Sequence, residues 1–511
     1  MSDDAMEYRE PLKVKPVERF SSSQIETVHR ASMKLLAETG ISCAGRTASE
    51  VYRAGGCRVE ETKKESRTHW QVYFPTQLVE EILKLVPSRV VLGARDPKNT
   101  LLLDARSPSV YFGTGSEANV YLRSQLKKFS AEGGHTIQYP VFTEEPGSIK
   151  ALCESAHLMQ QLDQVDFFIR NVNIRDEEVT PENKDVNVFF ASLLHTSKHI
   201  QGGLTDPEAL PAVIRMARLI GGGQEHLPIS FIVCPIKSPL SMVADSSEKV
   251  ISIARQKVPM VISSSPQGGS TAPIQEEGIT AQINAEILAG IVLAQLAGPG
   301  APVLYGSVPV QARLDTLHDC YGAPEFVRYA MDCAQMARWY GIPCYSSAGV
   351  GDAKRPGMQA MAEKLYSYLG TASAGAQYIH YAFGLLAGTN IFSPLQAVLD
   401  NASVRLAKDI LRTADFDEEG VDAAVQEIQT AAAGSGMFVR GIRKQLRRNR
   451  VSHPYEFVSE DEEDRVFAMA QQKLDSYLAQ EAEGLSEAVI RQVRGQIPGL
   501  LPIETWKGGS L

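Results

Sequence analysis

Val303-Leu304-Tyr305-Gly306-Ser307 is an apolar run that ends in small and polar residues, and it is the stretch that decides the fold. Met260-Val261-Ile262-Ser263-Ser264 before it and Cys344-Tyr345-Ser346-Ser347 after it repeat the pattern, and an amphipathic helical pattern follows each run. Short strands that are apolar throughout, without alternation, are typical of parallel sheets that are covered on both faces. The three runs therefore predict parallel strands joined by helices.

The same strand–helix unit occurs eight times in a row between about residues 109 and 413. Eight such units predict an α/β protein, a (β/α)8 TIM barrel, whose chemistry lies at the C-terminal ends of the strands. Asp206-Pro207 is typical of a helix start, and Gly341 of a helix end. The eight predicted strands are Ser109–Gly113, Val165–Asn171, His199–Gly202, Ile229–Cys234, Met260–Ser264, Val303–Ser307, Cys344–Ser347 and Gln377–Tyr381.

The barrel pattern divides the chain into three regions. Residues 1–108 predict a small α+β extension, and residues 109–413 predict the catalytic barrel. Within the barrel, residues 114–146 break the rhythm and predict a long excursion over one of its ends. Residues 414–511 are rich in Glu, Gln and Ala and predict a mostly helical extension packed on the barrel.

Composition limits the class of protein. The net charge is −9, which argues against a nucleic-acid partner because phosphate binding needs a basic surface. The basic cluster at residues 440–450 is interpreted as a solvated helix face. The chain has no run of 18 apolar residues, so we expect no membrane span. Its acidic start lacks the apolar segment of a signal peptide. Seven cysteines without C-x-x-C spacing favour a reducing cytoplasm and argue against structural zinc. A chain of this size also favours a homo-oligomer.

The predicted strand ends are poor in metal ligands and acids but rich in aromatic rings. No H-x-H pair, H-E-x-x-H, P-loop or G-x-S-x-G is present, so we expect no bound metal. His380, Asp352 and Glu117 are the candidate catalytic residues, although a histidine such as His380 can also be a satisfied core residue. Cys234 is interpreted as a small buried residue, because no partner histidine is indicated. The substrate-binding candidates are Tyr111, Phe112, Asn171, Ser265, Tyr305, Tyr345, Ser347, Tyr381 and Phe383.

This inventory suits an apolar cation. An ammonium group that carries methyl groups donates few or no hydrogen bonds but is attracted to ring faces, by ~1–2 kcal/mol per ring when water is excluded. The tyrosine and phenylalanine candidates, with His380, would form the cage; Asn171, Ser265 and Ser347 would bind a carboxylate or hydroxyl group. Neighbours on one strand face opposite ways, so about half of the rings should point into the barrel mouth.

Three stretches resemble the trimethylamine methyltransferase (MttB-like) superfamily: Tyr345–Lys354, continuing through Gln359-Ala360 and Glu363-Lys364; Gly202–Asp206; and Phe112–Gly115. The resemblance extends over roughly residues 20–490 in order and spacing. It implies transfer of a methyl group from a methylated amine to the Co(I) centre of a separate corrinoid protein. The chain contains only the twenty standard residues, so the resemblance points to the branch without pyrrolysine, which acts on quaternary amines such as betaines. The position of the pyrrolysine in other members of the family falls near residues 355–359 of this chain, and we assign no function to it.

The chemistry fits the absence of acids. When a quaternary ammonium loses a methyl group, the leaving group is already a neutral amine, so no strong general acid is required. Two alternatives remain open. A barrel lyase or hydrolase would use Lys237 or Lys354 with a carboxylate and would need a lysine of lowered pKa at a strand end. A catalytically silent barrel would bind a ligand and transfer nothing.

Overall fold

The computed structural model describes residues 7–64, 67–107, 109–130, 136–434, 456–457, 465–481 and 484–506. The basic cluster at residues 440–450 lies outside the described residues.

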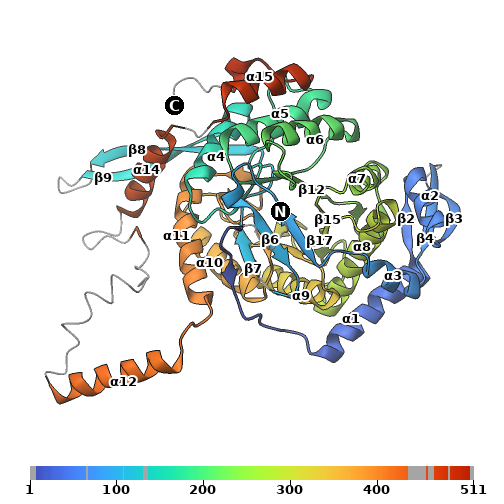
Figure 1. Ribbon diagram of the computed structural model, residues 1–511, viewed down its shortest axis with the longest axis horizontal. Coiled ribbons are helices and arrows are strands. Elements are labelled where there is room, and N and C mark those ends of the chain that lie inside the picture. Colours follow the sequence, from blue (N-terminus) through green and yellow to red (C-terminus); the bar gives the residue numbers. More distant parts are fainter. Residues whose placement is uncertain are drawn as a thin grey trace.

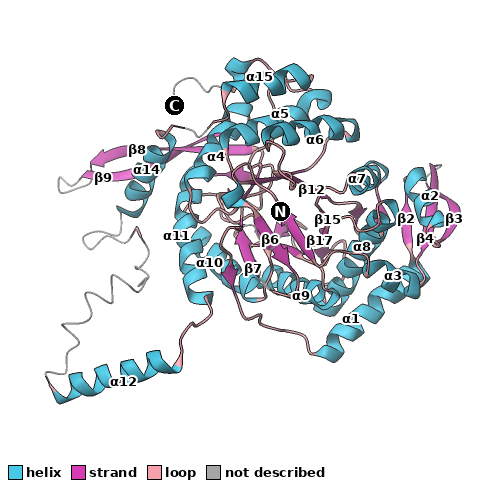
Figure 2. Ribbon diagram, viewed as in Figure 1, coloured by secondary structure: helices cyan, strands magenta, loops and turns pink. Residues whose placement is uncertain are grey.

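The centre of the protein is a strongly curled, largely parallel sheet surrounded by helices (Figures 1 and 2). Nine strands form it in the order β1-β7-β21-β20-β17-β15-β12-β11-β10, and only β1 runs antiparallel to its neighbour. A parallel bridge between Gly113 and Phe167 links β7 to β10, although these strands stand far apart in the order. The bounds are β1 (Leu12–Lys13), β7 (Ser109–Phe112), β10 (Phe167–Ile169), β11 (His199–Gly202), β12 (Ile229–Val233), β15 (Met260–Ser264), β17 (Val303–Ser307), β20 (Cys344–Ser347) and β21 (Tyr378–His380).

Each of the eight predicted parallel strands is present and leads to a helix. Ser148 and Ser393 accept hydrogen bonds from backbone amides at the starts of α4 and α11, and Gly341 ends α9 in the left-handed conformation at φ 68°. The helices are α4 (Ile149–Gln161), α5 (Pro181–His195), α6 (Leu210–Ile220), α7 (Ala244–Arg255), α8 (Glu276–Ala297), α9 (Pro324–Tyr340), α10 (Met358–Ser373) and α11 (Pro394–Leu411).

Helix α8 is the longest of these and the most apolar. It is long and apolar enough to cross a membrane, but 94% of its most apolar 18-residue window is buried inside the protein. Among the described residues it is the one helix that passes this test, and its burial is typical of a core helix.

The two faces of the curled sheet pack against different partners. Residues on its helix side join the main core, while Phe167, Leu304, Tyr345 and Tyr378 belong to a separate cluster inside the curl. The antiparallel pair β5 (Arg89–Leu92) and β6 (Leu101–Asp104) contributes Val90, Leu92, Leu101 and Leu103 to that inner cluster. Alternate strand residues point to opposite faces, which produces this separation.

The N-terminal region is woven into the rest of the protein. A five-stranded sheet of order β13-β14-β2-β4-β3 joins it to two short strands of the loop after β12. The division at residue 108 stays a prediction, as does the division at residue 413. The elements are α1 (Ser22–Lys34), η2 (Leu35–Thr39), β2 (Ile41–Cys43), α2 (Arg46–Ala54), β3 (Arg58–Lys64), β4 (Arg67–Tyr73), α3 (Thr76–Leu83), η3 (Pro97–Asn99), β13 (Ile236–Lys237) and β14 (Ser241–Met242).

The excursion at residues 114–146 contains a long antiparallel pair, β8 (Val120–Ser130) and β9 (Thr136–Pro146). It pairs with β23 (Ile391–Phe392), which pairs with β22 (Leu385–Leu386) after the last barrel-type strand. A further small sheet joins β16 (Gln267–Gly268), β18 (Val310–Ala312) and β19 (Asp319–Cys320). These short strands lie at the end of the central sheet where the parallel strands finish.

The C-terminal helices differ in how they pack. Helix α14 (Arg465–Leu478) contacts α4, α11 and β9, and α15 (Glu487–Gln496) contacts α6. Helix α12 (Glu418–Ala433) buries no residue and extends away from the body in Figure 1. The expectation of a helical extension packed on the barrel over residues 414–511 stays a prediction.

Candidate functional site

Aromatic rings from two neighbouring strands stack inside the curled sheet. Tyr345 on β20 lies over His380 of β21, with centroids 4.3 Å apart and 19° between the planes. It also stacks with Tyr378, at 5.8 Å. Tyr381 follows His380 at 3.6 Å, and Tyr321 meets Tyr381 edge-on at 6.4 Å. The pairing of Tyr345 with Tyr378 in register places these rings on one face.

His380 is a buried neutral histidine. Its Nδ1 lies 2.8 Å from the carbonyl oxygen of Ser346, and a carbonyl only accepts, so Nδ1 carries the proton. Burial lowers the pKa of His380 to about 3, against the opposing effect of this hydrogen bond. At neutral pH its Nε2 is therefore an unprotonated acceptor. Ser347 Oγ lies 3.4 Å from Nδ1 and 3.5 Å from Nε2, which brings two predicted site residues together.

Cys234 is the accessible thiol beside these rings. The residue is exposed, yet desolvation raises the pKa of its thiol, with Ser263 opposing through a hydrogen bond. Desolvation is the largest cause of the raised pKa of Tyr345 and of Tyr381, and the charge of Cys234 raises the pKa of both further. The interpretation of Cys234 as a buried residue was therefore wrong; its position directly after β12 was the only signal in the sequence.

The loop after β7 crosses close to the rings. A Cβ on Gly115 would lie 3.2 Å from both His380 and Tyr381, so the absence of a side chain lets the backbone approach. Tyr381 itself has φ 71°, an unusual conformation for a bulky residue, and it turns the chain at the end of β21. The Gly113-Thr114-Gly115 stretch is thus a close backbone approach to the candidate site.

Glu117 and Asn171 lie at the ends of the adjoining segments. Glu117 forms an ion pair with Arg170, and its charge also raises the pKa of Tyr381, by less than desolvation and Cys234 do. Asn171 is fully buried, and neither atom of its side-chain amide has a hydrogen-bond partner among the described residues. Both predicted residues therefore lie on the β7–β10 side of the same strand ends.

Asp352 supports the site from outside. Its carboxylate accepts hydrogen bonds from the backbone amides of Tyr321 and Gly322, each at 3.0 Å, and from the thiol of Cys320 at 3.2 Å. Glu363 in turn accepts from the amide of Asp352 at 2.9 Å. Asp352 thereby holds the segment whose Tyr321 ring meets Tyr381, and its catalytic role stays a prediction.

Two further polar residues follow β15. Ser265 is exposed and donates to the carbonyl of Val308 at 2.8 Å, which ties two loops together. Glu286 on α8 is fully buried and accepts from the hydroxyls of Ser238, at 2.7 Å, and Ser264. Sequence reasoning missed Glu286, because an isolated acid in the middle of an apolar helix gives no sign of its partners.

Three predicted cage residues lie on the helix side of the sheet. The Tyr305 hydroxyl donates to Asn284 of α8 at 3.0 Å, and Phe112 meets Tyr368 of α10 edge-on at 6.1 Å. Phe383 is fully buried in the main core. The rings of Tyr305 and Phe112 are separated from the Tyr345 group by the sheet itself, whereas Phe383 follows β21 and lies in the main core.

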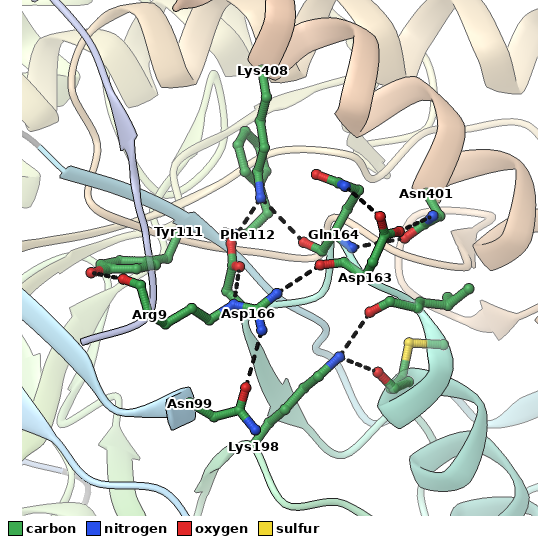
Figure 3. A network of polar contacts seen from close by, with 12 residues as sticks. Arg9, Asn99, Tyr111, Phe112, Asp163, Gln164, Asp166, Lys198, Asn401 and Lys408 are labelled. Atoms are coloured by element: carbon green, nitrogen blue, oxygen red, sulfur yellow. Dashed lines mark hydrogen bonds and ion pairs between the residues drawn. The ribbon is translucent and has the colours of Figure 1, made fainter. Parts of the chain in front are cut away.

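Tyr111 faces the interior of the curled sheet, but its hydroxyl group is hydrogen-bonded to the N-terminal arm, the segment before β1 that contains Arg9. It donates to the carbonyl of Arg9 at 3.2 Å, beside a network in which Asp166 joins Arg9 and Lys408 (Figure 3). In that network Lys198 donates to two backbone carbonyls at the end of α4. Tyr111 therefore lies at the part of the interior that the arm covers.

The residues of the alternative mechanisms are not gathered here. Lys237 and Lys354 are both exposed. Among the described residues, no group of three or more His, Cys, Asp or Glu side chains is placed to hold a metal ion.

Comparison with known proteins identifies similar sequences. A family model described as trimethylamine methyltransferase (MTTB) matches residues 3–131 and 141–450. The trimethylamine methyltransferase MttB of Methanosarcina thermophila is 29% identical over 437 residues, which cover 84% of each chain. MttB of Desulfitobacterium hafniense is 30% identical over 394 residues, 76% of this chain and 74% of the relative. The glycine betaine methyltransferase of Desulfitobacterium hafniense Y51 is 25% identical over 449 residues, 87% of this chain and 86% of the relative.

Proposed function

This chain belongs to the trimethylamine methyltransferase family, and from that premise we propose that it transfers a methyl group from a small quaternary or tertiary methylamine to the corrinoid of a separate protein. The observation that carries the proposal is the group of rings in which Tyr345 stacks on His380 and Tyr381 lies tilted against His380, beside the exposed residue Cys234. Ring faces without a nearby free acid suit an N-methylated cation.

The same proposal includes the architecture. We propose that the eight parallel strands form a closed (β/α)8 barrel. The parallel bridge from Gly113 to Phe167 supports closure, because it joins β7 to β10. Two backbone hydrogen bonds reinforce the junction, from the Asp166 amide to Phe112 at 2.7 Å and from the Thr114 amide to Phe167 at 3.4 Å. In such a barrel the stacked rings lie at the C-terminal mouth.

The residues of this chain would act mainly by positioning. The rings of Tyr345 and Tyr381 attract the ammonium group, and the uncharged His380 avoids repelling it. The substrate loses its positive charge as the methyl group departs, so a dry pocket disfavours the charged ground state more than the transition state. The corrinoid of the partner protein, when docked at the mouth, would supply the methyl acceptor.

A direct assay tests the proposal. The purified protein is incubated with a reduced corrinoid, or with its cognate corrinoid protein, and with trimethylamine or one of several betaines. We expect the absorbance change of corrinoid methylation with at least one amine and none without the enzyme. If no member of the panel methylates the corrinoid while all of them bind, the protein is a silent ligand-binding barrel instead.

Ligand binding has its own readout. Iodoacetamide should alkylate the accessible Cys234, and peptide mass spectrometry reports the extent at this residue alone. We expect a bound methylamine to slow this alkylation. Cys153, which is buried, serves as an internal control that should react only when the protein unfolds.

A further inference from the structure

A cleft lies at the end of the central sheet where the parallel strands begin. Its volume is about 580 Å³, and the loops that lead into β12, β15 and β17 line it, with Pro259 and Pro302 directly before the last two strands. Strand β5 forms a further wall through Val90 and Val91. Cavities of this volume are large enough for a small-molecule ligand. His380 ends β21, so the cleft lies at the opposite end of the sheet from the proposed methylamine site.

Positive charge gathers in this cleft, although the chain as a whole is acidic. Arg89 of β5, Arg218 of α6 and Lys257 after α7 line it. Among the described residues that line the cleft, Glu225 is the one acid. With histidine counted as neutral, the lining has an excess of two positive charges in a protein whose net charge is −9. A cleft lined mainly by one sign of charge concentrates ions of the opposite sign.

Two of the three cations have no carboxylate partner in the part of the chain that the structure describes. Arg218 is exposed and forms no hydrogen bond or ion pair with the described residues. Lys257 donates to the backbone carbonyl of Pro299 rather than to an acid. Arg89, in contrast, lies 3.6 Å from Asp104 of β6. The guanidinium of Arg218 and the ammonium of Lys257 are therefore available to an anion.

The walls of the cleft pack closely against one another. A Cβ on Gly93, which follows β5, would lie 2.3 Å from the carbonyl oxygen of His226 in the loop after α6. A Cβ on Gly298, which follows α8, would lie 2.4 Å from the carbonyl oxygen of Ala254 near the end of α7. The segments that carry the cations are thus held backbone against backbone. A preformed cleft of this kind lowers the entropic cost of binding a ligand.

The uncharged part of the lining is mostly apolar, with two amides. Val90, Val91 and Val258 are buried residues of the lining, and the two prolines extend the same surface. Gln224 and Gln256 add side-chain amides. Apolar walls with a small number of polar groups are typical of sites for organic ligands, and they suit a flat ring with a polar edge.

We infer that this cleft binds a phosphate ester of the size of a mononucleotide, at a site separate from the methylamine site. A phosphate monoester carries about −1.5 to −2 charges at neutral pH and three acceptor oxygens, which matches the excess of positive charge. The guanidinium of Arg218 and the ammonium of Lys257 bind the phosphate group through charge-assisted hydrogen bonds. The ring of the ligand lies on the valine and proline walls.

Calorimetric titration of the full-length protein tests the inference. The probes are the four common ribonucleoside 5′-monophosphates and the four corresponding nucleosides, which lack the phosphate group. We expect at least one nucleotide to bind at least about tenfold more tightly than its nucleoside, because only the nucleotide meets the two cations. Arg218→Met and Lys257→Gln, two changes at exposed residues, should each weaken the nucleotide about tenfold and leave the nucleoside unchanged.

Arg215→Met is the matched control. Arg215 is exposed on the same helix, one turn before Arg218, but does not line the cleft, so this variant should bind the nucleotide as the wild type does. Equal weakening in Arg215→Met and Arg218→Met would indicate diffuse attraction to the surface and overturn the inference.

A second control separates the two sites. A saturating nucleotide should neither protect Cys234 from alkylation nor change the protection that a methylamine gives, because the cleft and the rings lie at opposite ends of the sheet. Protection of Cys234 by the nucleotide itself would overturn the inference, as would equal binding of nucleotide and nucleoside or no binding of any nucleotide. None of these results bears on the proposed methyl transfer, which has its own assay.

Discussion

Tyr345 and His380 lie face to face inside the curled sheet, with ring centroids 4.3 Å apart and planes inclined by 19°. Neutral imidazole stacks on a phenol without introducing charge, and burial lowers the pKa of His380 to about 3. The pair therefore forms a flat, uncharged wall. Such a wall attracts a cation by its π face, whereas a protonated histidine at the same place would repel it.

Removal of one ring should weaken binding of the cation. We expect Tyr381→Leu, which keeps apolar bulk but removes the π face, to raise the dissociation constant of a quaternary amine by about 5- to 30-fold, corresponding to ~1–2 kcal/mol. The concentration of the amine that protects Cys234 from alkylation measures this dissociation constant. Tyr139→Leu, a ring on the exposed β9 strand, is the control and should change nothing. An unchanged dissociation constant for Tyr381→Leu would remove this ring from the cage.

The buried neutral His380 should make stability depend on pH. The unfolded chain binds a proton at the ordinary histidine pKa of 6.5, while the folded protein resists protonation down to about 3. The contribution of the neutral His380 to the free energy of unfolding is therefore fully present above pH 6.5. It is lost as the pH falls toward 3, at up to about 1.4 kcal/mol per pH unit for each such histidine. His199, whose pKa burial lowers to about 4, adds to the effect.

Chemical denaturation at pH 7.5 and pH 5 measures this dependence. The loss of stability between the two pH values should be smaller in His380→Gln than in the wild type, because the variant has one buried histidine fewer. Equal losses in the two proteins would contradict the assignment of His380 as neutral in the folded state.

The buried ion pair of Lys364 and Asp400 should be important for both stability and loop geometry. The two groups are 3.0 Å apart, with 1% and 0% of their side chains exposed. Lys364 also donates to the carbonyl of Gly349, after β20, and Asp400 accepts from the amide of Gly384, after β21, at 2.7 Å. The pair thus ties together the loops that follow the two strands of the stacked rings.

Removal of one partner leaves an uncompensated buried charge. We expect Lys364→Met to lower the free energy of unfolding by about 3–5 kcal/mol, and the double variant Lys364→Met/Asp400→Asn to recover part of the loss. Thermal or chemical unfolding measures both. A double variant as unstable as the single one would mean that the free carboxylate is not the source of the destabilisation.

Asp352 should affect affinity more than stability. In Asp352→Asn the new amide donors oppose the backbone amides of Tyr321 and Gly322, so the Tyr321 segment should loosen and Tyr381 should lose its edge contact. We expect a higher KM for the amine with a melting temperature within a few degrees of the wild type. Asp315→Asn, in an exposed ion pair with Arg313, is the control. A lower kcat at unchanged KM would assign Asp352 a catalytic role instead.

Much of the fold could be predicted because its signals are local. The eight strand–helix units appear as apolar runs followed by helical periodicity, and the predicted helix end at Gly341 and helix start at Asp206-Pro207 are confirmed. The family resemblance is also confirmed. Helix α12 buries no residue, because amphipathic periodicity indicates a helix but does not supply the surface that it packs on.

The site could be predicted only in part, because strand register decides which face a residue takes. Tyr345 pairs opposite Gly306, and Tyr305 pairs opposite Cys344. The two tyrosines are therefore out of phase by one residue and point to opposite faces of the sheet, although each precedes small residues at a strand end. No feature of the sequence distinguishes them.

The sequence by itself determined the order of strands and helices, the family and the types of side chain at the strand ends, since these follow from residue spacing within short windows. The tertiary structure alone decided that Tyr345 stacks on His380, that Cys234 is exposed, and that Arg170 and Asn171 keep unused donors. These properties arise from contacts between segments far apart in the chain. The pleat of each strand and the curl of the sheet bring those segments together, and neither is encoded in any single segment.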